Sequence, residues 1–312
     1  MYSGFMTKEE IVRELLRKGI IVTPETLEKI EKQGMTAIDS ETDAIAQSAP
    51  AGAAKKRITC RIKGVKLSRE ITVDDVVNIN VQRYEAVRRM LLRKTSAVSI
   101  NNIGRTNAKI TVIGMVSETA EGGFVIQDTT GILHVRSTTR PDIHDVIAVS
   151  GWMRNGILVG EEISYPDIPL DREINTMTGK VLLTYERGSH EQNADVVITE
   201  DSLIEQGQER MITNPAWLFL ENGTGKAVIF VYKTDNPVEK EDAVKMLKRR
   251  HIVRKETAIP NSAMVFETIP DIIWFISRNP PWVENYKGVS IISMPKGHNA
   301  LINLKTRKVE MS

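Results

Sequence analysis

The amino-acid sequence predicts a mixed α/β chain with a small N-terminal helical module, a five-stranded β-barrel and a layered α/β domain. Three observations predict it. Apolar residues recur at helical spacing near the N-terminus, short alternating segments follow one another between residues 108 and 164, and longer apolar runs with one clear helix come after residue 169. A chain of 312 residues with 41% hydrophobic side chains can bury several cores. We expect units at 1–38, 39–56, 57–170 and 171–312.

The first 56 residues predict a helical module on a flexible tether. Residues 7–34 carry apolar side chains at helical spacing, and Thr23 followed by Pro24 is typical of a helix N-cap and a first helical residue. Residues 39–56 are small and polar without periodicity, as in a linker. We therefore expect residues 1–38 to be tethered to the rest of the chain and not packed into it.

A strand and a long helix are expected next, in front of the barrel. Apolar residues alternate from Ile58 to Ile62, as in a half-buried strand, and a helix is predicted from about Val73 through Lys94. Its inward face is predicted to carry Val77, Val81, Tyr84, Val87, Met90 and Leu91. Its outward face is basic and carries Arg83, Arg88, Arg89, Arg93 and Lys94. Such a face fits phosphates or an acidic partner, although a solvated helix face is the more common case.

Five short segments then alternate in hydrophobicity and are separated by turn sequences. They are Lys109–Val116, Gly123–Gln127, Ile132–Arg136, Asp145–Ser150 and Gly156–Ile163. Five antiparallel strands at this spacing are typical of an OB-type barrel, in which Gln127–Gly131 would form the turn between the second and third strands.

Beyond Pro169 the pattern becomes that of buried strands with one helix. The expected strands are Lys180–Thr184, Val196–Thr199, Trp217–Leu220, Ala227–Tyr232, Ile272–Ile276 and Val289–Ser293. Glu239–Arg250 is the clear helix among them, which predicts an α/β or α+β layer domain.

Composition excludes several classes of protein. The net charge is only +2, so any contact with nucleic acid must be local. The single cysteine, Cys60, excludes an internal disulfide framework and is expected to be a buried thiol. Apolar runs such as Ile269–Ile276 fall far short of the ~20 residues that span a bilayer. A cytoplasmic protein without membrane contact is expected.

Three stretches of the chain resemble one known family. They are Val81–Val116 with the segment Val81-Gln82-Arg83-Tyr84-Glu85, Asp145–Pro169 with Tyr165-Pro166-Asp167, and the C-terminal series Met246–His251, Ile269–Ile272 and Tyr286–Val289. In this order they are similar to the small subunit of archaeal DNA polymerase D (DNA polymerase II small subunit) and, more distantly, to the B-subunits of eukaryotic replicative polymerases. The resemblance runs from about Ile71 to near the C-terminus.

The resemblance implies an OB barrel joined to a calcineurin-like phosphoesterase domain, in which Asp, His and Asn side chains hold two metal ions. The expected ligand motifs are missing here. Tyr185–His190 follows the first strand in place of Asp-x-His, Tyr232–Asp235 stands where His-Gly is expected, and Phe275–Pro281 stands where Gly-His-x-His is expected. We therefore predict a reduced, degenerate phosphoesterase-like domain with no metal, no cofactor and no intrinsic activity.

The remaining polar motifs have simpler interpretations. Asp142-Ile143-His144 is expected in a loop at a barrel strand entrance, and His298 in an exposed turn. His251 is expected to end the helix as a cation that favours the helix dipole. Asn222–Lys226 lacks the frame of a phosphate loop, and a hairpin turn explains it better.

The leading hypothesis is a non-catalytic partner of the large catalytic subunit of a DNA polymerase in replication or repair. An alternative is a barrel that binds single-stranded DNA, with Phe124, Trp152 and Tyr165 as stacking platforms. A third hypothesis is residual metal-dependent 3′–5′ exonuclease activity. The residues expected to contact DNA or the partner are Arg83, Arg88, Arg89, Arg136, Arg140, Trp152, Arg154, Lys248, Arg249 and Arg250, with Arg254 and Lys255 continuing the last run.

Overall fold

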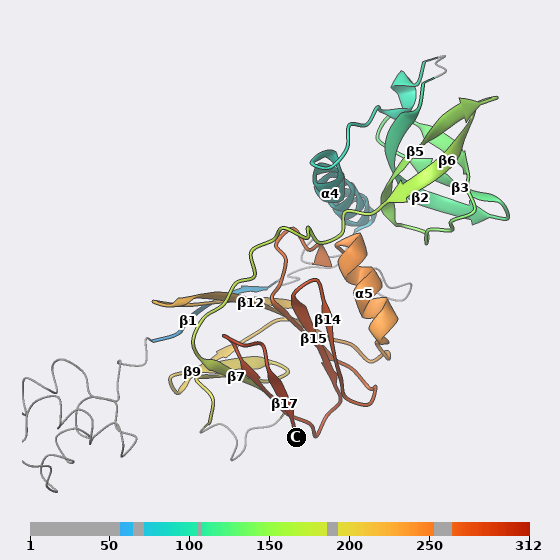
Figure 1. The fold of residues 1–312 in the computed structure, drawn as a ribbon. Helices are drawn as coiled ribbons and strands as arrows, with labels where there is room; N and C mark the ends of the chain where they lie inside the picture. The colour runs from blue at the N-terminus through green and yellow to red at the C-terminus, as the bar shows by residue number, and fades with distance from the viewer. Residues whose placement is uncertain (1–56, 65–71, 105–107, 186–192, 253–263) are drawn as a thin grey trace, which may run out of the picture. The chain divides into compact units, whose positions relative to one another are not determined.

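The computed structural model describes residues 57–64, 72–104, 108–185, 193–252 and 264–312 (Figure 1). Residues Ile58–Ser312 form one compact unit. The helical module predicted for residues 1–38 and the linker of residues 39–56 lie outside the described residues.

A closed five-stranded barrel is present, as the sequence predicts. Its strands are β2 (Ile110–Ala120), β3 (Gly123–Gln127), β4 (Ile132–Arg136), β5 (Val146–Arg154) and β6 (Ile157–Ser164). They pair in the order β2-β3-β4-β6-β5, and the antiparallel pairing of β2 with β5 closes the ring. Alternate residues fill the interior, among them Val112, Ile126 and Leu158, which are fully buried.

The turn between β3 and β4 is built around one carboxylate. Asp128 Oδ1 accepts hydrogen bonds from the backbone nitrogens of Thr130 (2.7 Å) and Gly131 (2.9 Å), and Oδ2 accepts one from the nitrogen of Ile100 (2.9 Å). This is the local bonding that favours aspartate in turns. Because the Ile100 nitrogen belongs to the segment leading into the barrel, Asp128 also ties that segment to the turn.

Helix α4 (Val73–Leu92) packs on the outside of the barrel, against β2 and β5. Tyr84, Val87 and Leu91 are buried there, as expected. The prediction for Val77 and Val81 is wrong, because these side chains are 54% and 47% exposed. These two residues share a stripe with the buried Tyr84, seven and three residues before it, but they lie in the first half of α4, where their side chains are left exposed.

The C-terminal half contains two six-stranded sheets. One has the order β1-β11-β12-β13-β15-β14, and the other has the order β10-β9-β8-β7-β16-β17. The first sheet consists of β1 (Thr59–Gly64), β11 (Ala216–Asn222), β12 (Gly225–Lys233), β13 (Ile272–Ile276), β14 (Trp282–Tyr286) and β15 (Val289–Met294). The second consists of β7 (Lys180–Leu183), β8 (Val196–Ile198), β9 (Ser202–Glu205), β10 (Gln208–Met211), β16 (Ala300–Asn303) and β17 (Val309–Met311).

The first sheet is buried on both faces. Ile229, Trp274 and Ile292 belong to the core that it shares with the second sheet. Phe230 and Phe275, one residue further along their strands, belong to a core that includes helix α5 (Lys240–Arg249). Figure 1 shows α5 beside β14 and β15. The run of apolar residues in β12 and β13 is therefore continuous, as in strands that are covered on both sides.

The strand β1 belongs to a different part of the fold from the one we expected. We expected Ile58–Ile62 to lead into the barrel, but β1 pairs with β11 of the first sheet, with Cys60 opposite Leu220. The alternation of apolar residues from Ile58 to Ile62 predicts a strand. Which strand it pairs with depends on the tertiary structure. Burial raises the pKa of Cys60 to about 12, so the thiol stays protonated at neutral pH, as expected for a structural cysteine.

The described part of the chain is mostly β. It has two α-helices, α4 and α5, against the two sheets and the barrel. Neither of these helices is long and apolar enough to cross a membrane. The sequence does not predict five strands of the two sheets, β9, β10, β14, β16 and β17, because they are short or partly exposed and lack a continuous apolar run.

Asp128 gives a prediction for the pH dependence of stability. Burial alone would raise the pKa of its carboxyl, but the hydrogen bonds from Ile100, Thr130 and Gly131 outweigh burial and lower it. A lowered folded-state pKa stabilises the fold above the unfolded pKa of ~4 and loses that contribution as pH falls through the folded value.

We expect Asp128→Asn to lower the free energy of unfolding by about 1–3 kcal/mol at pH 7, and by less at about pH 3.5. Urea denaturation at the two pH values measures both differences. Glu118→Gln, on an exposed barrel position, is the control. An equal cost of Asp128→Asn at both pH values would show that the ionised carboxylate does not hold this turn.

Candidate functional site

The ends of five strands meet at one edge of the two sheets, which we call the carboxyl edge. Strands β12, β13 and β15 run parallel to one another in the first sheet, and β7 and β8 run parallel in the second. Lys233 at the end of β12 forms a 2.7 Å ion pair with Glu200, two residues after β8. The carboxyl ends of both sheets therefore face each other here, which is where open sheets commonly place functional side chains.

Hydroxyl and amide groups follow the strands of the first sheet. Ser277, just after β13, lies 2.7 Å from the hydroxyl of Ser293 in β15, and both are buried. Asn279 is also buried, and its Nδ2 donates to Glu239 Oε1 at 2.7 Å. Asp235, after β12, is almost fully exposed and pairs with Arg278 at 3.4 Å.

The second sheet ends in threonines. Thr184, after β7, donates to Asn299 Oδ1 at 2.6 Å. Thr199, after β8, lies 2.8 Å from the hydroxyl of Ser202 and accepts from the Ser202 nitrogen at 2.9 Å. These described groups bond to one another and to backbone atoms.

The carboxyl edge does not assemble a set of metal ligands from the residues described. No group of three or more His, Cys, Asp or Glu side chains there could hold a metal ion. The carboxylate of Glu200 is paired with Lys233, and that of Glu239 is bonded to Asn279. His298 is half-buried, not exposed as we expected, and His190 lies outside the described residues.

Of the three aromatic residues considered as stacking platforms in the barrel, one is exposed. Phe124 is only 3% exposed and belongs to the barrel core, and the Tyr165 hydroxyl donates to Asp145 Oδ2 at 3.3 Å. Trp152 is 39% exposed, with its indole nitrogen donating to Glu161 at 3.1 Å. The three barrel arginines proposed for phosphate contact, Arg136, Arg140 and Arg154, are exposed.

The basic residues of α4 divide into exposed and half-buried ones. Arg89 is exposed and pairs with Glu267 at 3.2 Å, and Arg88 pairs with Glu85 at 3.6 Å. Arg83 is half-buried and donates to Asn80 Oδ1 at 3.0 Å and towards the sulfur of Met115. Arg83 therefore does not lie on an open outward face.

The side chains of Lys248, Arg249 and Arg250, at the end of α5, have three different environments. Lys248 is exposed. Arg249 forms ion pairs with Asp142 and, at 2.9 Å, with Asp145 Oδ1, two carboxylates of the loop before β5. Arg250 is buried, with Nε donating to the carbonyl oxygen of Phe266 at 2.7 Å. Two of these three predicted contact residues are thus engaged inside the protein.

We call the contact of Arg249 with Asp142 and Asp145 the barrel–sheet ion pair, because it joins the barrel loop to the helix that covers the first sheet. Asp145 is fully buried, which raises the pKa of its carboxyl to about 6, while Arg249 opposes the shift. At neutral pH the carboxyl is ionised and faces the guanidinium.

His251 does not act as the helix-ending cation that we expected. It is fully buried, and burial lowers its pKa to about 3, so the ring is neutral at physiological pH. Its Nδ1 lies 2.9 Å from the carbonyl oxygen of Arg249. The helix ends instead at Arg250, whose left-handed backbone (φ 60°) bonds back to Leu247 and Met246.

The hairpin predicted at Asn222–Lys226 is confirmed. Asn222 pairs with Gly225 at the end of β11 and β12, and the Asn222 side chain accepts from the Thr224 nitrogen at 2.9 Å. A Cβ on Gly225 would lie 2.0 Å from the Thr176 carbonyl oxygen, so glycine is needed for packing here and not for phosphate binding.

Comparison with known proteins adds one relationship. No family model matches the chain. The DNA polymerase II small subunit of Archaeoglobus fulgidus is 26% identical to it over 180 residues, which cover 54% of this chain and 34% of that protein. The chain thus spans about a third of the curated relative that it matches, and it is distantly related to DNA polymerase II small subunits.

The different environments of Lys248 and Arg249 at the end of α5 give a prediction for stability. We expect Arg249→Ala to lower the free energy of unfolding by about 3–5 kcal/mol, because it leaves the buried carboxylate of Asp145 without its cation. The neighbouring Lys248→Ala should change it by less than about 0.5 kcal/mol, because Lys248 is exposed. Chemical denaturation of both variants checks this, and similar losses in the two would contradict the assignment.

Proposed function

We propose that this chain is a non-catalytic, small-subunit-like partner of a DNA polymerase, and that it binds the large catalytic subunit. The observation that carries the proposal is the carboxyl edge, where hydroxyl, amide and paired side chains stand at the strand ends without a metal ligand set among the described residues. The relationship to a DNA polymerase II small subunit supplies the polymerase context.

The architecture supports this interpretation. A closed five-stranded barrel precedes two packed sheets, the order in which the small-subunit family joins an OB barrel to a calcineurin-like domain. In calcineurin-like enzymes, metal ligands follow the strands, so the carboxyl edge is the place where hydrolysis would occur. A chain kept for its binding surfaces would retain the strands without these ligands, and the described residues, which contain no group of three or more possible metal ligands, support that inference.

The barrel–sheet ion pair supports a role in assembly. It ties the loop before β5 to the end of α5, so the barrel and the first sheet present a joint surface. A preformed surface of this kind loses little conformational entropy on binding. The alternative of a single-stranded DNA-binding barrel has less support, since Trp152 remains as the exposed aromatic residue of the three considered.

Co-expression tests the partner. We expect the full chain to co-elute in size-exclusion chromatography with the catalytic large subunit of the DNA polymerase from the same genome, at equal stoichiometry. The large subunit with an unrelated barrel protein carrying the same tag is the control. Separate elution of the two proteins at micromolar concentration would refute the proposed partnership.

Metal content and nuclease activity test the absence of catalysis. We expect the purified chain, after incubation with Mn²⁺ and desalting, to retain far less than one ion per chain by elemental analysis, because the carboxyl edge offers bonded hydroxyls and amides. A 5′-labelled primer should stay intact with Mn²⁺ present. Shortening from the 3′ end, above the level of a mock purification, would overturn the non-catalytic assignment.

A further inference from the structure

A second polar cluster lies at the opposite edge of the first sheet, where β13 and β15 begin. Asp271 immediately precedes β13, and Lys287 lies in the turn between β14 and β15. We call this cluster the basic stripe. Its basic members come from the end of α4, the segment after β6, the end of α5 and two C-terminal turns: Arg93, Lys94, Arg172, Lys248, Arg250, Lys287 and Arg307.

Asp167 is the centre of the stripe. Its carboxylate accepts hydrogen bonds from Lys287 Nζ at 2.6 Å and from the Tyr286 hydroxyl at 3.0 Å. The charge of Asp167 also attracts Lys94 and Arg250, and Lys94 Nζ donates to the carbonyl oxygen of the preceding residue, Pro166. One carboxylate thus collects cations from three separate segments of the chain.

Asp271 holds the buried end of the stripe. It is fully buried, pairs with Arg172 and lies 3.6 Å from Arg307. Its Oδ2 accepts from the Val228 nitrogen at 2.8 Å and from Asn175 Nδ2 at 3.0 Å. Two guanidinium groups therefore share one carboxylate, which leaves positive charge in excess at this end.

The charges do not balance along the stripe. Among the described residues that these ion pairs and charge interactions connect, three carboxylates, Asp167, Asp171 and Asp271, stand with the seven basic side chains. The cations repel one another: burial lowers the pKa of Lys94, with Lys287 and Arg250 adding to the effect, and burial lowers the pKa of Arg250 to about 10, with Arg172 and Arg93 adding. A polyanion would relieve this repulsion.

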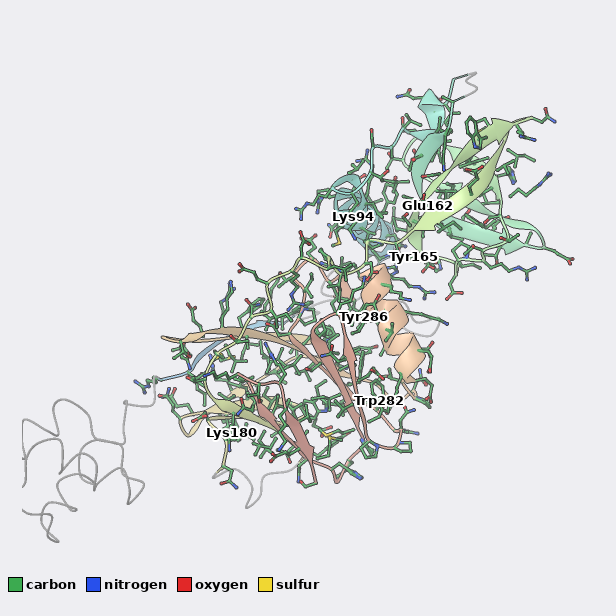
Figure 2. The ribbon with its side chains drawn as sticks, viewed as in Figure 1. Lys94, Glu162, Tyr165, Lys180, Trp282 and Tyr286 are labelled. Carbon is green, nitrogen blue, oxygen red and sulfur yellow. The ribbon has the colours of Figure 1, made fainter. Side chains whose placement is uncertain are left out.

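The accessible part of the stripe combines cations with an aromatic ring. Lys248 Nζ lies 5.9 Å and Lys287 Nζ 5.5 Å from the centre of the Tyr286 ring, which its hydroxyl bond to Asp167 holds in place. Arg93, Lys94 and Lys248 are exposed around it. Lys94 and Tyr286 are labelled in Figure 2. Exposed lysine and arginine side chains grouped in this way can neutralise phosphates of a nucleic-acid backbone.

We propose that the basic stripe binds the phosphate backbone of DNA, on the edge of the first sheet opposite the carboxyl edge. The choice of DNA as the polyanion rests on the proposed function, while the anion-binding character rests on the stripe itself. Binding is independent of sequence, because the contacts go to phosphates. The stripe holds DNA without acting on it.

Fluorescence anisotropy tests the proposal with the full chain and a labelled duplex or single strand of about 30 nucleotides. We compare the wild type with Arg93→Glu/Lys248→Glu, which reverses two exposed charges and leaves Lys94 and Lys287 with their internal partners. The matched control is Arg136→Glu/Arg154→Glu, two exposed arginines of the barrel. Circular dichroism and the melting temperature show that each variant is folded.

We expect the stripe variant to weaken duplex binding at least about tenfold at low salt. The dependence of log Kd on log salt should become flatter by about 2, one unit for each phosphate that the variant no longer neutralises. The barrel variant should bind as the wild type does. Equal weakening in both variants, or wild-type binding by the stripe variant, would overturn the proposal, as would no wild-type binding at about 50 mM salt.

Co-elution with the large subunit separates this inference from the proposed function. If the stripe variant fails to bind DNA but still co-elutes, both proposals stand. If DNA binding is unchanged and co-elution is abolished, the stripe binds an acidic face of the partner, and the DNA proposal falls while the partnership stands. If the wild type binds DNA through the stripe but never co-elutes, only the partnership fails.

Discussion

The burial of the first sheet on both faces is the constraint on which the rest of the structure depends. Strands β12 and β13 place alternate residues, such as Ile229 and Phe230, into two different cores. Parallel strands covered in this way are nearly continuous apolar runs, so most of their polar neighbours lie at or near the strand ends. The chemistry of this half of the protein is therefore confined to two edges, and the character of each edge follows from the few residues that stand there.

The two edges differ in a physically simple way. At the carboxyl edge, several described side chains bond to one another: Ser277 with Ser293, Thr184 with Asn299, Lys233 with Glu200. A cation needs several oxygen or nitrogen donors converging on one point, and no such group of His, Cys, Asp or Glu side chains is found among the described residues. At the opposite edge, the basic side chains of the stripe outnumber its carboxylates, and an excess of positive charge attracts a partner of the opposite sign.

Three consecutive basic residues, Lys248, Arg249 and Arg250, contact different parts of the protein because helix α5 ends there. The left-handed backbone of Arg250 ends α5, so consecutive side chains leave in different directions. Arg249 reaches the barrel loop, while Lys248 and Arg250 take part in the basic stripe. A single run therefore contributes both to the joint between barrel and sheet and to a charged surface.

The sequence by itself determined the elements with strong local signals. The five barrel strands, the six buried strands and helices α4 and α5 follow from alternation, apolar runs and helical spacing, which act between near neighbours. The sequence also predicts that the ligand motifs of the family it resembles are missing after those strands, a prediction that rests on the resemblance. The thin aromatic content of the barrel was visible too.

Only the tertiary structure decided which strand pairs with β1, that Val77 and Val81 are exposed, and that His251 is buried and neutral. The basic stripe could not be found from the sequence, because Arg93, Asp167, Lys248 and Lys287 are far apart along the chain and no motif links them. The physical reason is the same in each case. Strand pairing, burial and electrostatic contact depend on distances in space. The periodicity of apolar residues along the chain indicates only the local secondary structure.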